Sequence, residues 1–374
     1  MIQELRFRFL LLTVLLLQAS TPATAQNRCG VEEEYFRIHP RGYLCMRADT
    51  PITIDGLADD EAWSAAPWSE DFVDIEGERC AEPRFRTRVK MLWDEEFFYF
   101  FAEMEEPHVW GTLTERDAVI FHDNDFEIFL DPDRDNHEYY EFEMNALNTV
   151  WDLYLPKPYR DGGPADNSWD IAGLRSAVHI RGTLNDARDE DLGWTAEIAI
   201  PWRAFTRSVV HPPHEGAVWA VNFSRVEWRH RLRHGRYEKV PDTKEDNWVW
   251  SPQGVVDMHR PEKWGLVQFV SDVDENTPLP QDLEHDAIMA LHRIYWAQKA
   301  FYKEHGRWAA QLTELAIDPA SLRIDGLLPV LRLDGAGYRA ACSLPRHSTD
   351  APGTTTIGID HESRVHRTYN ADKE

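Results

Sequence analysis

Alternating hydrophobic and polar residues between positions 123 and 152 predict two neighbouring β-strands. In the first strand, Phe126, Ile128 and Leu130 alternate with Glu127 and Phe129. In the second, three hydrophobic side chains alternate with two carboxylates and an amide: Tyr140, Phe142 and Met144 against Glu141, Glu143 and Asn145. A period of two places one face of each strand in a core. The other face carries groups that can hydrogen-bond to polyols.

The same alternation predicts strands along most of the chain. Residues 86–93 and 97–104 form a hairpin around the turn at 94–96. Further strands are expected at 177–184, 194–200, 218–228 and 265–270. Many short strands separated by turns are typical of an antiparallel β-sandwich, immunoglobulin-like or jelly-roll-like. The fold class is therefore mainly β.

A change of period after residue 282 predicts a small α+β extension. Hydrophobic residues at helical spacing run through 283–305, and Gly306 ends the helix. Strands are expected at 328–333, 338–343 and 354–359. The segment from Ala290 to Leu315 resembles the helix and first loop of pilin-like and pseudopilin globular regions. The extension can serve as a docking domain or as a cap on the sandwich, and we favour the cap.

The first 25 residues have the pattern of a signal peptide. Arg6 and Arg8 precede a short apolar stretch at 9–17, and small residues at 23–25 offer a cleavage site. Export to a periplasmic or extracellular location is therefore expected, with no integral membrane segment in the mature chain. The remaining boundaries are a leader at 26–48, the sandwich at 49–271, a linker at 272–281 and the tail at 282–374.

Charge and cysteine content narrow the function and the compartment. The formal net charge of −25 over 374 residues makes nucleic acid and anionic membranes poor partners. The four cysteines, in an exported protein, allow three complete sets of disulfides. Three of them lie close in sequence, and Cys45–Cys80 is the bridge we prefer; the full set is Cys29, Cys45, Cys80 and Cys342.

Several motifs occur in an order that resembles the family 9 carbohydrate-binding modules and their DOMON-like relatives. They are Ile52 to Gly56 followed by Trp63, the hairpin string V-K-M-L-W-D-E-E-F-F-Y-F-F-A, E-I-F-L-D-P at 127–132, and Y-Y-E-F-x-x-N at 139–145. The resemblance covers residues 49–271. It implies a β-sandwich that binds sugars on a concave face, often carries structural calcium, and works beside polysaccharide-degrading enzymes.

The resemblance also assigns candidate sugar-binding residues. Glu127 falls at the position of a sugar-binding carboxylate, and Asn145 matches the amide of the following strand. Asn222 and Ser224 lie on a strand that lends polar groups to the same face.

Three positions depart from the family pattern. Phe121 and Met258 stand where the best-known members place two tryptophans that clamp a sugar. Glu143 replaces an arginine. The site is therefore expected at the same place but with different chemistry.

Other residues allow two interpretations each. Trp248 and Trp250 can form a sugar platform or anchor a long loop. Arg225, Glu227 and His259 can orient sugar hydroxyls or form a buried ion pair that fixes loops.

The acidic run after residue 130 also has two interpretations. Asp131, Asp133 and Asp135 resemble the opening of a calcium loop, yet position six of that pattern is Asn136 rather than glycine. They can bind a structural calcium or form a solvated acidic turn.

Two other functions draw on residues of the same region. Glycoside hydrolysis requires a pair of carboxylates across a cleft, for which Glu127 and Glu143 are the candidates. Haem binding, as in some DOMON relatives, would draw on the following residues: Met258, His259, His122 and Met144. The motifs favour a non-catalytic carbohydrate-binding protein.

Overall fold

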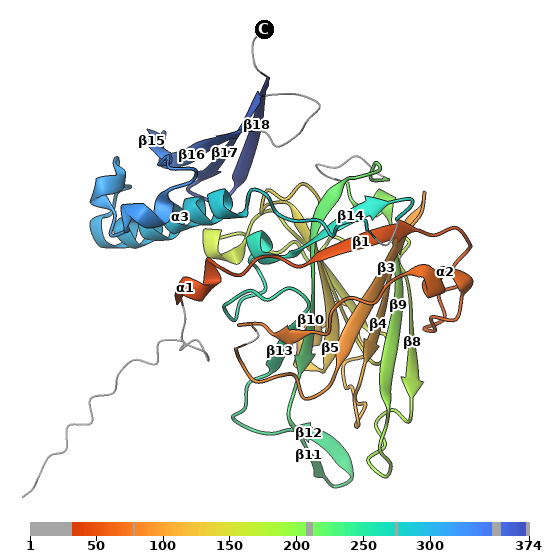
Figure 1. Ribbon diagram of the computed structural model, residues 1–374. Coiled ribbons are helices and arrows are strands. Elements are labelled where there is room, and N and C mark those ends of the chain that lie inside the picture. Colours follow the sequence, from red (N-terminus) through yellow and green to blue (C-terminus); the bar gives the residue numbers. More distant parts are fainter. Residues whose placement is uncertain (1–31, 78, 207–211, 274–275, 346–352, 372–374) are drawn as a thin grey trace, which may run out of the picture.

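The computed structural model describes residues 32–77, 79–206, 212–273, 276–345 and 353–371 (Figure 1). These residues form one large curled sheet, a two-stranded sheet, and a four-stranded sheet that a long helix covers. The predicted mainly β sandwich with a small α+β extension is confirmed. Among the described residues, no helix is both long enough and apolar enough to cross a membrane. The predicted signal peptide, residues 1–25, lies outside the described residues.

Twelve strands make up the large sheet. Their bounds are β1 (Gly42–Arg47), β2 (Val73–Asp74), β3 (Thr87–Trp93), β4 (Phe97–Met104), β5 (Asp125–Asp131), β6 (Tyr139–Asn145), β7 (Val150–Leu155), β8 (Arg175–Arg181), β9 (Gly193–Pro201), β10 (Val218–Glu227), β13 (Asp246–Val249) and β14 (Gly265–Val270). Hydrogen bonds join them in the order β7-β6-β5-β10-β14-β1-β3-β4-β9-β8, and β13 pairs with β10 and β2.

Curling of the sheet encloses one hydrophobic core. Phe126, Ile128 and Leu130 of β5 enter it, as the alternation predicted, and so do Phe142 and Met144 of β6. The opposite faces of these strands carry the carboxylates. A separate cluster holds Trp63 on α2 (Glu61–Ala65), whose indole N–H donates to Glu197 Oε1 at 2.8 Å.

The predicted leader is partly wrong, because residues 42–47 form β1 inside the large sheet. β1 pairs in parallel with both β14 and β3, so the sandwich is not wholly antiparallel. Tyr43 and Cys45 on this strand belong to the core. A leader that supplies two core residues folds with the sandwich.

The predicted Cys45–Cys80 disulfide is also wrong. Cys45 is a free, fully buried thiol inside the core, and burial raises its pKa well above the usual value. Cys80 is disulfide-bonded, but not to Cys45. Closeness in sequence misled the prediction, because β1 turns Cys45 toward the interior.

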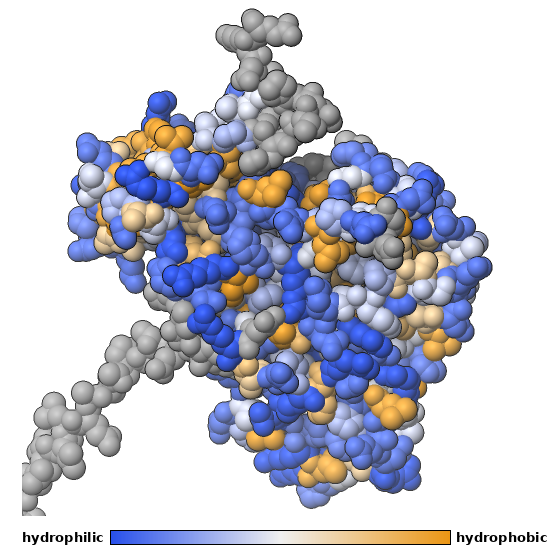
Figure 2. Space-filling view, in the orientation of Figure 1, coloured by the Kyte–Doolittle hydropathy of each residue, from blue (hydrophilic) through white to orange (hydrophobic). Residues whose placement is uncertain are grey.

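The tail forms its own layer beside the sandwich. The helix α3 (His285–His305) ends at Gly306 in the left-handed conformation, as predicted. It packs on a sheet with the order β15-β16-β17-β18 (Figure 1). The strand bounds are β15 (Val330–Asp334), β16 (Gly337–Pro345), β17 (Gly353–Asp360) and β18 (Val365–Ala371). Hydrophobic residues gather over the tail in Figure 2. The exposed large hydrophobic side chains of the tail include Leu327, Leu328, Val330 and Leu333.

Several shorter elements complete the described fold. They are the hairpin β11 (His230–Arg233) and β12 (Arg236–Lys239), the helix α1 (Glu32–Tyr35), and the 3-10 turns η1 (Ile120–His122), η2 (Tyr159–Asp161), η3 (Trp202–Ala204), η4 (Pro261–Lys263), η5 (Leu312–Glu314) and η6 (Pro319–Leu322).

Buried polar contacts hold the tail against the sandwich. The Arg160 guanidinium donates to Glu262 at 2.8 Å, and His292 of α3 lies 3.5 Å from the same carboxylate. Asp161 accepts hydrogen bonds from Tyr295 and Lys299 of α3 at 2.6 and 2.7 Å. The contact fits the capping role, since the helix contributes polar groups to a closed interface.

Candidate functional site

The face of β5, β6 and β10 that points away from the main core is polar around Glu127, and further along the strands Phe129 and Tyr139 form a separate hydrophobic cluster there. Glu127 of β5 lies directly opposite Glu143 of β6, and on its other side opposite Ser224 of β10. Asp125 and Glu141 lie on the same face, two residues from Glu127 and Glu143 along their strands. This arrangement follows from the period of two, because residues i and i+2 share a face.

Four carboxylates therefore form a group that we call the carboxylate cluster: Asp125, Glu127, Glu141 and Glu143. Each side chain is at most 5% exposed. One oxygen each from Asp125, Glu127 and Glu143 lies within 4.8 Å of the others. The cluster is a concentrated patch of buried hydrogen-bond acceptors.

Burial and mutual repulsion make these groups hold their protons. Burial raises the pKa of Glu127 to about 7, although the Ser224 hydroxyl opposes this change. Burial and the charge of Glu127 raise the pKa of Glu141 to about 8. The same two causes raise the pKa values of Asp125 and Glu143 well above the usual range. Near neutral pH the cluster can therefore both donate and accept hydrogen bonds.

Aromatic side chains lie beside the cluster. Phe121 of η1 is 36% exposed, and its backbone N–H donates to Glu143 at 3.1 Å. Trp151 of β7 pairs with Glu143 in the sheet, and its ring centre lies 6.4 Å from that of Phe121. Tyr159 of η2 is exposed, and the charges of Glu141 and Glu143 contribute to the rise of its pKa, after burial. We call Phe121, Trp151 and Tyr159 the aromatic rim.

A lysine and a tryptophan border the cluster near the β11–β12 hairpin. The Lys239 ammonium lies 3.5 Å from the ring centre of Trp228. Burial lowers the pKa of Lys239, and the negative charges of Asp123 and Asp125 oppose this effect. The Trp228 indole donates to the carbonyl of Phe121 at 2.8 Å, which ties this border to the aromatic rim.

Comparison with known protein families identifies the sandwich. Residues 54–268 match the family model described as carbohydrate family 9 binding domain-like. The chain belongs to this family. No curated protein matches the sequence.

Solved structures of family 9 modules resemble the chain at low identity. A module from Caldicellulosiruptor kristjanssonii in complex with cellotriose is 16% identical, with 64% of this chain and 98% of that chain covered and a TM-score of 0.41. A module from the same organism in complex with glucose is also 16% identical, with 63% and 98% covered and a TM-score of 0.41.

Two predicted sugar-binding amides of the family 9 domain hold loops instead. The Asn145 side chain is fully buried and donates to Leu113 O and Asp123 Oδ2 at 2.9 and 3.0 Å. The Asn222 amide is equally buried and joins both backbone groups of Ser251. Because protein groups already occupy both side-chain amides, the predicted roles of Asn145 and Asn222 in sugar binding are wrong.

The two tryptophans of the 246–251 segment are anchors, so their assignment as a platform is wrong. Trp248 is 3% exposed and Trp250 is 0% exposed. The Trp250 ring fills the space over Gly265, where a Cβ atom would come within 2.3 Å of it. Glycine at 265 is what allows this close packing.

The predicted Arg225 and Glu227 pair is a buried ion pair, which was the alternative interpretation. Arg225 is 1% exposed and donates to Glu227 and Glu106 at 2.9 and 3.0 Å. Its guanidinium also donates to the carbonyl of Glu105. The group fixes loops and offers no free donor to a sugar.

Met258 and His259 lie at the edge of the polar face, where His259 completes the wall beside Tyr159. The ring centres of Tyr159 and His259 are 4.4 Å apart, and His259 Nδ1 hydrogen-bonds to the Tyr139 hydroxyl at 2.9 Å. Burial lowers the pKa of His259 to about 4. Met144 lies in the core on the other side of the sheet, so it cannot share an iron with His259.

The Asp131, Asp133 and Asp135 group keeps part of the geometry of a calcium site. One oxygen of each carboxylate lies within 4.8 Å of the others. Backbone N–H groups of Arg134 and Asn136 already donate to Asp131, and the tail residue Arg364 forms an ion pair with Asp135 at 2.6 Å. Each oxygen retains a second lone pair, so the donor set remains compatible with calcium.

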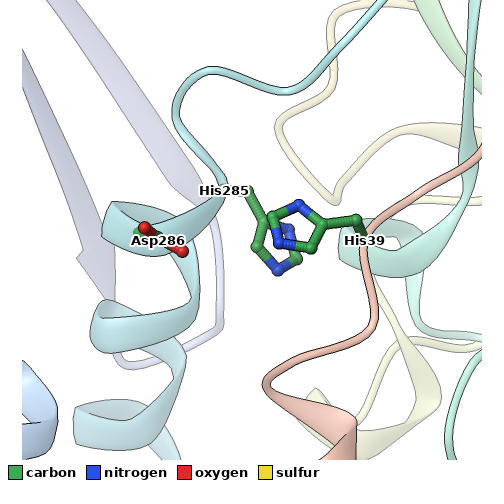
Figure 3. Close-up of side chains that lie close together, drawn as sticks. All are labelled: His39, His285 and Asp286. Atoms are coloured by element: carbon green, nitrogen blue, oxygen red, sulfur yellow. The ribbon is translucent and has the colours of Figure 1, made fainter.

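Another group of ligand-type side chains lies where α3 begins (Figure 3). His39, His285 and Asp286 approach one another there, and the two imidazole rings stack with centres 3.9 Å apart and planes inclined by 30°. Lone pairs of stacked imidazoles lie in nearly parallel planes and do not converge on one ion. The positive charge of Lys263 also acts on His285. We therefore assign this group to packing.

Sequence reasoning missed most of the aromatic rim. Trp151 could have been found, because the alternation that placed Glu143 on the outer face continues into β7 and pairs the two residues. Tyr159 and Trp228 lie in or beside turns and carry no periodic signal. Only the folded chain brings them to the cluster.

Proposed function

We propose that this family 9 domain binds a carbohydrate over the carboxylate cluster, with the aromatic rim as its apolar wall. The observation that supports this best is the combination of Glu127 and Glu143 with the partly exposed rings of Phe121 and Trp151 on one face. A sugar presents hydroxyl groups to acceptors and C–H groups to aromatic faces. Family membership supports the same class of ligand.

The function that fits this geometry is binding without hydrolysis. A hydrolase needs its two carboxylates on either side of the glycosidic bond, about 5 to 9.5 Å apart. Glu127 and Glu143 instead project side by side from neighbouring strands, and both are buried. An exported binding protein of this kind would act beside a separate polysaccharide-degrading enzyme.

Calorimetric titration of the full chain with a panel of sugars, including glucose and cellotriose, tests the proposal. Phe121→Ala and Trp151→Ala should each weaken binding about 2- to 10-fold, since an aromatic contact contributes about 0.5–1.5 kcal/mol. Tyr302→Ala is the matched control, because this exposed tyrosine lies on the tail helix. Its affinity should equal that of the wild type.

Two results would count against the proposal. Equal affinities for the wild type and both rim variants would place the sugar elsewhere on the molecule. Release of reducing sugar from an oligosaccharide by the purified protein, lost in Glu127→Gln, would show an enzyme.

A further inference from the structure

Two oxygen atoms of the carboxylate cluster are buried without a hydrogen-bond donor. Asp125 is 0% exposed, and its Oδ1 accepts from the Val226 N–H at 3.2 Å. The other oxygen of Asp125, Oδ2, has no partner among the described residues, and neither has Oε2 of Glu141. A buried acceptor without a donor costs about 1–3 kcal/mol, so something outside the chain is expected to satisfy these atoms.

In the described part of the chain, no basic side chain forms an ion pair with Asp125, Glu127 or Glu143. Like charges directly opposite each other on paired strands are destabilising, and Glu127 lies directly opposite Glu143. Neither carboxylate, nor that of Asp125, belongs to any of the ion pairs in the described residues. Lys239 is close enough to be affected by Asp125, but its ammonium rests on the Trp228 ring.

The three carboxylates are spaced for one shared ion. One oxygen each from Asp125, Glu127 and Glu143 lies within 4.8 Å of the others. Calcium binds carboxylate oxygens at about 2.3–2.6 Å, so ligands on opposite sides of the ion are roughly 5 Å apart. All three oxygens can therefore contact the same ion. An all-oxygen, carboxylate set selects Ca²⁺, Mg²⁺ or Mn²⁺ over metals that prefer nitrogen or sulfur.

We infer that Asp125, Glu127 and Glu143 hold one divalent cation of the calcium class. The free oxygen of Glu141 can accept a hydrogen bond from water bound to that ion. The ion would lie under the aromatic rim and remove the repulsion between β5 and β6. This site differs from the Asp131, Asp133 and Asp135 group, which begins at Asp131, the last residue of β5, and continues into the following turn.

Calcium titration of the EDTA-treated full chain, with no sugar present, tests the inference. Glu127→Gln and Glu143→Gln keep the shape of each side chain and remove its charge. Each should weaken calcium binding at this site by at least about 10-fold, the loss typical of disturbing a metal site. Asp133→Asn is the matched control, since it changes the other acidic group and should leave this site intact.

The folded state of each variant is checked by its thermal midpoint in EDTA. Removal of one repelling charge should leave Glu143→Gln at least as stable as the wild type there, and Glu127→Gln provides a second, independent variant. The inference is overturned if the wild type takes up no calcium, or if both glutamine variants bind as the wild type does. Binding lost only in Asp133→Asn would also overturn it. Sugar binding plays no part in these outcomes, so they are separate from the proposed function.

Discussion

Replacement of Glu262 by glutamine should destabilise the folded protein where the sandwich meets the tail helix. The Glu262 side chain is fully buried, accepts from Arg160 at 2.8 Å and from the Tyr35 hydroxyl at 2.5 Å, and lies 3.5 Å from His292. Although burial acts to raise it, the charge of Arg160 holds the pKa of Glu262 well below its usual range. The carboxylate is therefore ionised at neutral pH.

The size of the effect follows from what Glu262→Gln leaves behind. The Arg160 side chain is 8% exposed and would remain buried without its main counter-charge. Breaking a buried pair on one side costs about 3–5 kcal/mol. Asp161, whose carboxylate lies 3.7 Å from the Arg160 guanidinium, keeps some compensation, so about 3 kcal/mol is expected.

Urea unfolding followed by tryptophan fluorescence measures this change. With a denaturant dependence of about 1–3 kcal/mol per molar urea, the midpoint should fall by at least about 1 M. Glu95→Gln is the control, since it breaks the exposed pair with Arg47 and should leave the midpoint unchanged. Equal midpoints for the two variants would refute the claim that the buried Arg160–Glu262 pair stabilises the folded protein.

Three further predictions concern pH, thiols and calcium. The pKa of Glu141 is about 8 in the folded protein and 4.5 is its ordinary value, so the free energy of unfolding of the wild type should fall as pH rises from 4.5 to 8. Over that window Glu141→Gln should gain up to a few kcal/mol of stability relative to the wild type. A constant difference in stability between the two proteins from pH 5.5 to 8.5 would contradict this. Cys45 and Cys342 are buried free thiols, so a thiol reagent should label them only after unfolding, and rapid labelling of the native protein would refute their burial. If Asp131, Asp133 and Asp135 bind calcium, EDTA should lower the thermal midpoint of the wild type more than that of Asp133→Asn. Equal shifts of the two midpoints would mean that this acidic turn binds no calcium and is simply solvated.

Much of the fold was predictable because its strands are short apolar or alternating runs separated by turns. β4 and β14 have the predicted bounds, and β10 differs by one residue, since each of these strands places every second side chain in the core. β1 was missed because its partners β14 and β3 are far away in sequence. The six residues of β1 follow a polar segment, and their sequence gives no sign that they pair in parallel with β14 and β3.

The site was predictable only in part. The alternation and the family resemblance placed Glu127 and Glu143 on the outer face, and the structure brings them together there. Burial could not be read from the same pattern, so Asn145 and Asn222 were assigned to a ligand although backbone groups occupy their amides. Tryptophan content is equally ambiguous, because an indole that anchors a loop and one that contacts a sugar look alike in sequence.

The most direct test of the central claim is a crystal structure of the protein soaked with the sugar that binds most tightly. We predict a sugar ring against Phe121 or Trp151, with a hydroxyl within hydrogen-bond distance of Glu127 or Glu143. A sugar bound away from this face would contradict the account. One such place is the cleft of about 830 Å³ beside the tail that Trp296, Tyr302 and Trp308 help to line.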